Sequence, residues 1–286
     1  MINDRRQLAD VYQQTIDIVL EGSYTSESGE EVELLDNEPM LKGSRFYTRA
    51  LDATSIPTIE GETKIIVEND DSIHCGHQLQ KEGYNPVVLN LASRRNPGGG
   101  VLNGSRAQEE SLFRSTNLFL SMYRYASYAA EYGLEKSRYQ YPLAVPFGGV
   151  YVPKATVFRV GAKQDFALLD TPYYMSFVAV PAINHPELDA DGNITEHDAA
   201  ITKNKMRTML RIGLLHGHDS IVLGAFGCGA FHNPPHHIAR LFHEVIDEAE
   251  FKNKYKLIAF AILEDLNSPR GGNLQPFIEE FNPYQQ

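Results

Sequence analysis

The stretch that decides the fold and the chemistry runs from Asn90 to Thr116 and reads NLASRRNPGGGVLNGSRAQEESLFRST. It holds three consecutive glycines, Gly98 to Gly100, and the triplet Gln108-Glu109-Glu110 follows them after a short spacer. Glycine has no side chain to hold a ligand away, and it adopts positive φ angles that other residues avoid. The segment therefore predicts a loop whose amides press against a ligand, and we expect Gly99→Val to block the ligand while leaving the fold intact.

A helix is expected to follow this loop. Ser105 and Gln108 have the S-x-x-Q spacing of a capping box, which predicts a helix that begins at Ser105 and continues to Tyr132. Glu109 and Glu110 would lie in its first turns, held rigidly beside the glycines. Neighbours on a helix point about 100° apart and cannot flank one bond, so we expect one glutamate to exchange protons and the other to position the substrate.

Together, the GGG and QEE segments at this spacing resemble the signature of the poly(ADP-ribose) glycohydrolases, and the surrounding NPGGG and NGSRAQEESLFRS look most like the microbial type. The resemblance implies hydrolysis of ribose–ribose O-glycosidic bonds, with release of ADP-ribose by attack from the chain end. It also implies that Glu110 is the catalytic acid and that Glu109 hydrogen-bonds ribose hydroxyls. No cofactor and no metal ion are expected.

A second glycine-rich segment, SIVLGAFGCGAF, occupies Ser220 to Phe231. It reads as a buried strand entering a loop, and a helix should begin near Pro234-Pro235, because proline suits a first turn. Free amides and a helix dipole at such a place bind anions. By the resemblance, this loop wraps the ADP-ribose diphosphate and Phe231 lies beside the distal ribose. A tight turn with structural glycines is the alternative interpretation.

The predicted substrate-binding residues come from both segments. Asn96, directly before Pro97 and the glycines, either binds a ribose hydroxyl or only caps the turn. The full set is Asn96, Gly98, Gly99, Gly100, Val101, Gln108, Gly224, Ala225, Phe226, Gly227, Cys228, Gly229, Ala230 and Phe231.

Two other chemistries compete for these segments. The histidines in His74-Cys75-Gly76-His77 and around His232 are possible metal ligands, but neither set has a recognised zinc spacing. Cys228, near a helix N-terminus, is a possible nucleophile because such a position stabilises a thiolate. We expect neither. A non-catalytic ADP-ribose-binding macrodomain and a hydrolase of single ADP-ribosyl groups stay open as alternatives, and only the complete QEE triplet argues against the first.

The fold class follows from the order of apolar runs. Strands alternate with helical stretches, which predicts an α/β three-layer sandwich with a mixed sheet; the name macrodomain-like comes from the resemblance. We expect an N-terminal accessory helical segment over residues 1–60, with helices at Arg5–Leu20 and around Leu51, and a catalytic domain over residues 61–286. The expected strands are Lys64–Glu68, Pro86–Leu91, Thr156–Val160, Ser176–Pro181, Ser220–Ala225 and Lys256–Leu263, and the remaining helices are Glu196–His216, Pro235–Glu250 and Gln275–Phe281.

Composition limits the partners. The chain has 286 residues, 42% of them hydrophobic and 22% charged, with a formal net charge of −11. This charge argues against a nucleic-acid groove, which needs a basic surface. If poly(ADP-ribose) is the substrate, local amides and a few basic residues must hold its phosphates, and four arginines lie near the motif: Arg94, Arg95, Arg106 and Arg114.

The expected setting is intracellular. Residues 1–10 lack the apolar core of a signal peptide, and no apolar run approaches the roughly 20 residues of a membrane span. Two cysteines, Cys75 and Cys228, do not make a disulfide framework. We expect a cytoplasmic monomer, or a nuclear one in a eukaryote, whose partners are poly(ADP-ribose) or ADP-ribosylated proteins.

Overall fold

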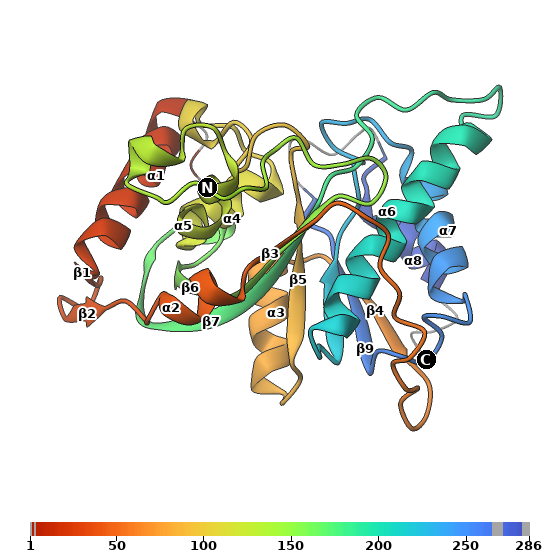
Figure 1. Cartoon of the computed structure of the whole chain (residues 1–286), viewed down its shortest axis with the longest axis horizontal. Coiled ribbons are helices and arrows are strands. Elements are labelled where there is room, and N and C mark those ends of the chain that lie inside the picture. The colour runs from red at the N-terminus through yellow and green to blue at the C-terminus, as the bar shows by residue number, and fades with distance from the viewer. Residues whose placement is uncertain (1, 3, 265–270, 282–286) are drawn as a thin grey trace. The chain divides into compact units, whose positions relative to one another are not determined.

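The computed structural model describes residues 2, 4–264 and 271–281 of the chain (Figure 1). The chain forms two compact units, each assembled from segments that alternate along the sequence. Unit 1 comprises Met1–Phe46, Ala92–Leu143 and Val150–Phe177, and unit 2 comprises Tyr47–Leu91, Ala144–Gly149 and Val178–Gln286. Within the described residues, no helix is both long and apolar enough to cross a lipid bilayer.

Unit 2 is built on a parallel sheet. Its strands lie in the order β5 (Pro86–Leu91), β8 (Ser220–Leu223), β9 (Leu257–Ala261) and β4 (Lys64–Glu68). The pairs β5–β8, β8–β9 and β9–β4 are all parallel. Every residue of β8 and β9 is buried. Because successive side chains on a strand point to opposite faces, both faces of the sheet are covered, as continuous apolar strands predict.

Four helices cover this sheet. Helix α3 (Ser72–Lys81) packs on β5, β8 and β9, α6 (Glu196–Leu215) packs on β8, and α8 (Leu274–Phe281) packs on β4. Helix α7 (Pro235–Ile246) lies against α6 and α8. Its apolar residues recur at helical spacing and are buried: Ile238, Leu241, Phe242 and Val245.

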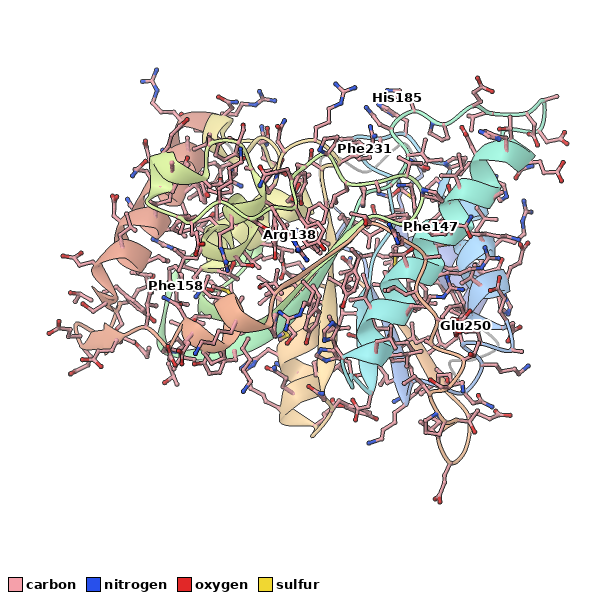
Figure 2. The ribbon with its side chains drawn as sticks, viewed as in Figure 1. Arg138, Phe147, Phe158, His185, Phe231 and Glu250 are labelled. Carbon is pink, nitrogen blue, oxygen red and sulfur yellow. The ribbon has the colours of Figure 1, made fainter. Side chains whose placement is uncertain are left out.

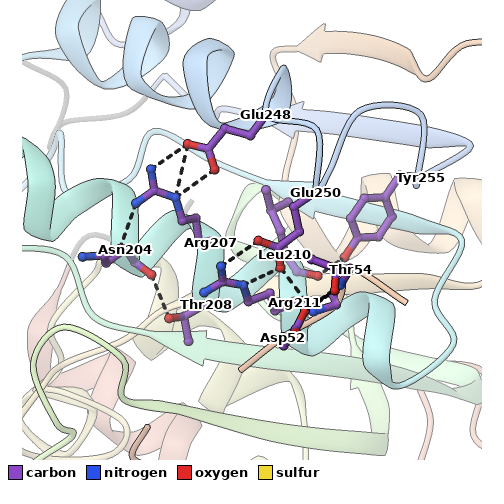
Figure 3. Close-up of polar contacts among 11 residues, drawn as sticks. Asp52, Thr54, Asn204, Arg207, Thr208, Leu210, Arg211, Glu248, Glu250 and Tyr255 are labelled. Carbon is purple, nitrogen blue, oxygen red and sulfur yellow. Dashed lines mark hydrogen bonds and ion pairs between the residues drawn. The ribbon is translucent and has the colours of Figure 1, made fainter. Parts of the chain in front are cut away.

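Two arginines on α6 tie that helix to the turns that follow α7 (Figure 3). Arg207 forms a forked pair with Glu248, with Nε and Nη2 within 2.8 Å and 2.6 Å of its carboxylate oxygens. Arg211 pairs with Glu250 in the same way, at 2.6 Å and 2.7 Å. Glu250 also accepts from the Ala53 amide at 3.2 Å. The last of these bonds holds the irregular segment around Ala53 against the rest of unit 2.

Unit 1 carries the longer strands. Strand β3 (Arg45–Tyr47) lies beside β6 (Gly149–Arg159), and β6 lies beside β7 (Leu168–Val180). Residues 160–167 join β6 to β7, and a link this short permits only an antiparallel pair. Strands β1 (Ser23–Thr25) and β2 (Glu31–Glu33) form a separate antiparallel hairpin, and the Tyr24 hydroxyl of β1 donates to the Leu169 carbonyl of β7 at 2.6 Å. The protein is therefore α/β with parallel and antiparallel strands, as predicted.

The helices of unit 1 are mostly short. Helix α1 (Arg5–Glu21) begins at Asp4, whose carboxylate accepts from the Arg6 amide, and it confirms the predicted N-terminal helix. The other helical elements of the unit are α2 (Glu38–Gly43), η1 (Val101–Asn103), α4 (Gln108–Ser115), α5 (Leu118–Met122), η2 (Tyr123–Tyr125), η3 (Ala129–Tyr132) and η4 (Ala162–Gln164).

Two helix predictions were wrong. No helix forms around Leu51, where the chain runs as turns and irregular backbone. The continuous helix from Ser105 to Tyr132 is instead four short elements, because Thr116 takes an extended conformation (φ −141°, ψ 171°) and makes an antiparallel bridge with Val157. The other predicted strands and helices lie within a few residues of where the sequence placed them, with β6 and β7 longer than expected, whereas α2, α3 and the short strands β1, β2 and β3 were not predicted. The division of the chain at residue 60 stays a prediction.

Candidate active site

The triple glycine forms a tight loop in unit 1. Gly98 and Gly99 have φ angles of 80° and 55°, which side-chain-bearing residues rarely adopt. The Gly99 amide donates to the Asn96 carbonyl at 3.0 Å, and the Val101 amide donates to the Gly98 carbonyl at 3.1 Å. The chain then enters η1. The loop is thus closed by its own backbone, and the Asn96 side chain remains exposed.

Helix α4 begins at Gln108, so the predicted capping box at Ser105 was wrong. The N-cap residue is Ala107, in an extended conformation and without a side-chain cap. Ser105 instead completes the glycine loop: its amide donates to the Gly100 carbonyl at 3.2 Å, and its carbonyl accepts from Arg114 at 2.7 Å. The later start still leaves Glu109 and Glu110 in the first turn, as expected.

The two glutamates turn back onto the glycine loop and are bound differently. Glu109 is 3% exposed; its Oε1 accepts from the Gly98 amide at 3.1 Å and its Oε2 from the Ser93 amide at 2.7 Å. Glu110 is 7% exposed, and its Oε1 accepts from the Gly100 amide at 2.8 Å. The Oε2 atom of Glu110 is buried without a hydrogen-bond partner among the described residues. Both oxygens of Glu109 are therefore bonded to backbone amides, whereas Glu110 keeps one oxygen without a partner among the described residues.

The glycines are required by packing within the protein. A Cβ at Gly99 would collide with Glu110 Oε1 and lie 3.2 Å from Glu109 Oε2. A Cβ at Gly98 would lie 2.8 Å from the Phe113 ring, and one at Gly100 would collide with Ser105 Oγ. The side chain added by Gly99→Val would therefore displace the carboxylates before any ligand arrives, and whether that variant keeps its fold stays a prediction.

Helix α1 holds the glycine loop and α4 together through Arg114. This side chain is 1% exposed; its Nε donates to the Leu8 carbonyl at 2.9 Å and its Nη2 to the Ser105 carbonyl. The Thr15 hydroxyl returns a bond to the Arg114 carbonyl at 2.6 Å. Burial lowers the pKa of Arg114 to about 10, against the opposing effect of Glu110, so the guanidinium stays charged at neutral pH. Arg114 was expected among the phosphate ligands, but its burial and backbone contacts make it a structural residue.

The other predicted residues of this segment lie around the loop. The Val101 side chain is buried, while Gln108 is partly exposed at the first position of α4. Arg94 donates through Nε to the Leu143 carbonyl at 3.1 Å. Arg95 and Arg106 are exposed.

The second glycine segment forms a loop in unit 2 that an asparagine organises. Gly227 has a φ of 76°. Asn233, 2% exposed, donates from Nδ2 to the carbonyls of Ile183 (2.7 Å), Gly227 (3.1 Å) and Phe231 (3.3 Å). The sequence interpretation missed Asn233, although an asparagine directly before Pro234-Pro235 is a recognisable turn and cap signal.

Side chains of this loop divide between the core and the surface. Phe226 is buried and meets Phe242 edge-on, with the ring centroids 6.3 Å apart. Phe231 is partly exposed, and its carbonyl accepts from the His185 amide at 2.9 Å; both residues are labelled in Figure 2. Helix α7 begins at Pro235, which confirms the predicted start. Gly224, Ala225, Gly229 and Ala230 complete the loop.

Neither rival chemistry gains support. Cys228 is buried, and burial raises the pKa of its thiol far above the ordinary value, so no thiolate forms at neutral pH. His74 pairs with Asp70, with Nδ1 and Oδ2 2.6 Å apart, on an exposed face of α3. In the part of the chain that the structure describes, no three histidine, cysteine or acidic side chains gather as metal ligands would.

A match to a known protein family covers the first half of the chain. Residues 12–160, slightly more than half of the chain, match the profile of the family described as microbial-type PARG, catalytic domain, where PARG is poly(ADP-ribose) glycohydrolase. This chain belongs to that family. It is therefore an enzyme of a glycohydrolase family, and the glycine loop and the QEE helix both lie inside the matched residues.

Solved PARG structures resemble the chain over almost its whole length. The poly(ADP-ribose) glycohydrolase of Thermomonospora curvata matches with a TM-score of 0.80 and 27% identity, over 96% of this chain and 100% of that one. The same enzyme bound to the inhibitor ADP-HPD gives a TM-score of 0.78 at 28% identity, with the same coverage. The Deinococcus radiodurans enzyme in complex with ADP-ribose matches with a TM-score of 0.68 and 25% identity, over 88% of this chain and 99% of that one. No curated protein sequence matches.

Proposed function

We propose that this PARG-family chain hydrolyses the ribose–ribose O-glycosidic bonds of poly(ADP-ribose) and releases ADP-ribose from the chain end. Family membership supports the reaction, and the relatives solved with ADP-ribose and ADP-HPD support the ligand class. The observation that carries the proposal is the unequal environment of the two carboxylate oxygens of Glu110.

Glu110 has the geometry of a general acid. Its Oε1 accepts a hydrogen bond from the Gly100 amide, so the proton of the acid form resides on Oε2. Oε2 is buried without a partner among the described residues, and leaving such an atom unbonded costs about 1–3 kcal/mol. A substrate oxygen placed there would remove this cost and receive the proton along a hydrogen bond.

The proposed reaction uses Glu110 twice. As the glycosidic C–O bond breaks, the proton on Oε2 passes to the leaving ribose oxygen, and the anomeric carbon becomes an oxocarbenium-like centre. Water then attacks that carbon, and its proton returns to the Glu110 carboxylate. The enzyme ends in its starting protonation state, and the products are ADP-ribose and a chain one unit shorter.

Glu109 is proposed to position the terminal ribose. Amides of Ser93 and Gly98 bind both of its oxygens and fix the carboxylate beside the glycine loop. Each carboxylate oxygen can accept two hydrogen bonds, so the same group can receive ribose hydroxyls as well. Asn96 is proposed as a further partner of the ribose, because its side chain is exposed at the end of the loop.

The second loop is proposed to bind the diphosphate. Residues 224–231 supply backbone amides ahead of helix α7, and free amides before a helix N-terminus favour an anion. Phe231, partly exposed, is proposed to contact the distal ribose. No role is assigned to the Cys228 thiol beyond packing.

The decisive experiment measures release of ADP-ribose from labelled poly(ADP-ribose) by the native protein, Glu110→Gln and Glu109→Gln. Glutamine keeps an oxygen for the Gly100 amide but carries no acidic proton, so Glu110→Gln should lower kcat about 10³-fold, within the range for loss of a general acid. Its affinity for free ADP-ribose should change little. Glu131→Gln, at an exposed glutamate of the same unit, serves as the control and should behave as the native protein.

Three results would contradict the proposal. Binding of ADP-ribose without any release would indicate a non-catalytic reader. Release only from proteins carrying a single ADP-ribosyl group would indicate the mono-ADP-ribosyl hydrolase. Oligomeric products at early times would contradict attack from the chain end.

A further inference from the structure

A pocket in unit 1 opens beside the segment that precedes the glycines. Its volume is about 260 Å³, and it is lined by residues 95–97, residues 126–128, Lys136, Gln140 and Tyr141. Asn96 and Pro97 form one wall and are continuous with the glycine loop. The pocket therefore borders the place where Glu109 and Glu110 meet the loop, although neither glutamate lines it.

The pocket is positively charged in an acidic protein. Its lining includes Arg95 and Lys136 and no acidic residue, whereas the whole chain has a net charge of −11. Neither Arg95 nor Lys136 forms an ion pair with any residue that the structure describes. Elsewhere in the chain exposed lysines do find acids, as Lys256 does with Asp219 at 3.0 Å. Two uncompensated cations at one concave place attract an anion.

Two tyrosines line this pocket without adding charge to it. The Tyr128 hydroxyl lies 3.5 Å from the Pro97 carbonyl, and the Tyr141 hydroxyl oxygen is buried without a partner among the described residues. Burial, with a contribution from the charge of Glu109, raises the pKa of Tyr128 to about 12 and that of Tyr141 well above its ordinary value. Both phenols therefore stay neutral at neutral pH and add no negative charge that would repel a phosphate, although Tyr128 donates its proton to the Pro97 carbonyl and the Tyr141 hydroxyl is buried.

We propose that this pocket binds the phosphates of the ADP-ribose unit next to the terminal one, on the leaving-group side of the bond that is cut. The proposal rests on the proposed function above and adds a subsite to it. Every unit of the polymer carries a diphosphate, so once the terminal ribose lies at Glu110 the next diphosphate must leave past the walls of the glycine loop. Asn96 and Pro97 line the same pocket as Arg95 and Lys136, the two cations without an ion pair among the described residues.

The test is a charge-matched pair of double variants. Arg95→Gln with Lys136→Gln removes both cations of the pocket. Arg138→Gln with Lys154→Gln removes two cations of the same unit that lie outside it. Arg138 rests over the Tyr139 ring at 4.8 Å and is labelled in Figure 2, and Lys154 lies 5.9 Å from the centre of the Tyr174 ring.

The measurements are kcat and KM on protein-free poly(ADP-ribose) of defined length, together with the affinity for free ADP-ribose. Exposed charge contacts are individually weak and are screened by salt, so the pocket variant should raise KM for the polymer roughly three- to tenfold at low salt. Its slope of log(kcat/KM) against log[salt] should become shallower by about 2, one for each lost contact. Its kcat and its affinity for free ADP-ribose should match those of the control pair.

Each other outcome overturns the proposal. An equal loss of affinity for free ADP-ribose would place the cations at the terminal unit. A KM effect equal in both double variants would indicate general charge attraction. An effect seen only on chains still attached to a protein would assign the pocket to the protein carrier. If the native protein releases no ADP-ribose, the proposed function fails, and that result is visible before any variant is compared.

Discussion

The two glycine loops are held in place by different chemistry. In unit 1, carboxylates accept from the amides of Gly98 and Gly100, and the carboxylates belong to the residues proposed to act on the substrate. In unit 2, the neutral amide of Asn233 donates to the loop carbonyls of Gly227 and Phe231 and to the carbonyl of Ile183, and it belongs to no proposed catalytic group. The first loop cannot be disturbed without moving Glu109 and Glu110, whereas the second has its own support.

This difference also explains which amides each loop offers. The carboxylates of unit 1 occupy the amides of Gly98 and Gly100, which leaves fewer donors for an anion. Asn233 binds carbonyls in unit 2 and leaves amides to a ligand. The first loop is therefore suited to fix an acid, and the second is suited to bind a phosphate.

The largest expected effect comes from a matched pair of alanine substitutions, one in each glycine loop. Gly99→Ala should lower kcat about 100-fold, because a Cβ at a φ of 55° collides with Glu110, and displacement of a catalytic group by about 1 Å costs on this order. Gly224→Ala should change kcat less than about twofold, since its Cβ would meet the Ala261 carbonyl at 3.5 Å and Leu91 Cδ1 at 3.7 Å, both ordinary contacts. Steady-state kinetics on labelled poly(ADP-ribose) measures both.

Equal losses in the two alanine variants would contradict the contrast between the loops. Native activity in Gly99→Ala would contradict the position of Glu110 itself. Circular dichroism spectra of both proteins should match that of the native chain, so that a loss of activity reports the loop and not global unfolding.

Much of the fold and of the candidate site was predictable because the signals are local. Continuous apolar runs place β4, β5, β8 and β9 within a few residues. The sequence also places both glutamates at the start of a helix beside the glycines, although the capping box began that helix at Ser105 and not at Gln108. Proline at the start of α7 is another local signal, and it gave the observed start.

The remaining features depend on contacts between distant residues. Ser105 resembles a helix cap in sequence, but Arg114 and Gly100 bind its backbone and keep it in the loop. Arg114 resembles a phosphate ligand until helix α1 covers it, about a hundred residues earlier in the chain. Helix α3 was missed because its signal is short, an N-cap by Asp71 to the amides of Ile73 and His74. A single sequence does not reveal such partners.

The second prediction concerns a substitution that should weaken only the second loop. Asn233→Ala leaves three carbonyls without their shared donor, and we expect a loss of about 2–3 kcal/mol in the free energy of unfolding. In a protein of this size that corresponds to a fall in Tm of roughly 5–10 °C. The affinity for ADP-ribose should fall, but kcat at saturating substrate should stay near native, because Glu109 and Glu110 do not depend on Asn233.

Asn233→Asp sharpens that result. The carboxylate has nearly the same size but presents oxygen to three carbonyl oxygens, so its destabilisation should exceed that of alanine. Asn103→Ala, at an exposed asparagine of unit 1, is the control and should leave Tm unchanged. A stable Asn233→Ala protein with native affinity would remove Asn233 as the organiser of the loop.

The smallest expected effect is a change of thermal stability with pH that comes from helix α7, which follows the second loop. His237 on α7 is 7% exposed, and its Nδ1 accepts from the Ile194 amide at 2.8 Å. Burial, helped by the charges of Arg240 and His236, lowers the pKa of His237. The folded protein therefore resists protonation at this ring. The resulting stability is complete above the unfolded pKa of about 6.5, and it is lost as the pH falls toward the folded value.

We therefore expect the Tm of the native protein to fall by a few degrees between pH 7.5 and pH 5.5, at about 2–4 °C for each kcal/mol. His237→Gln keeps an acceptor for the Ile194 amide but does not titrate, so its fall should be smaller. His218, whose pKa burial also lowers, contributes to the native curve, and the comparison with His237→Gln isolates the α7 contribution. His197→Gln, at an exposed histidine of α6, should follow the native curve. If His237→Gln follows it too, protonation of His237 does not weaken the region of the second loop, and the acid sensitivity of the protein must come from other groups.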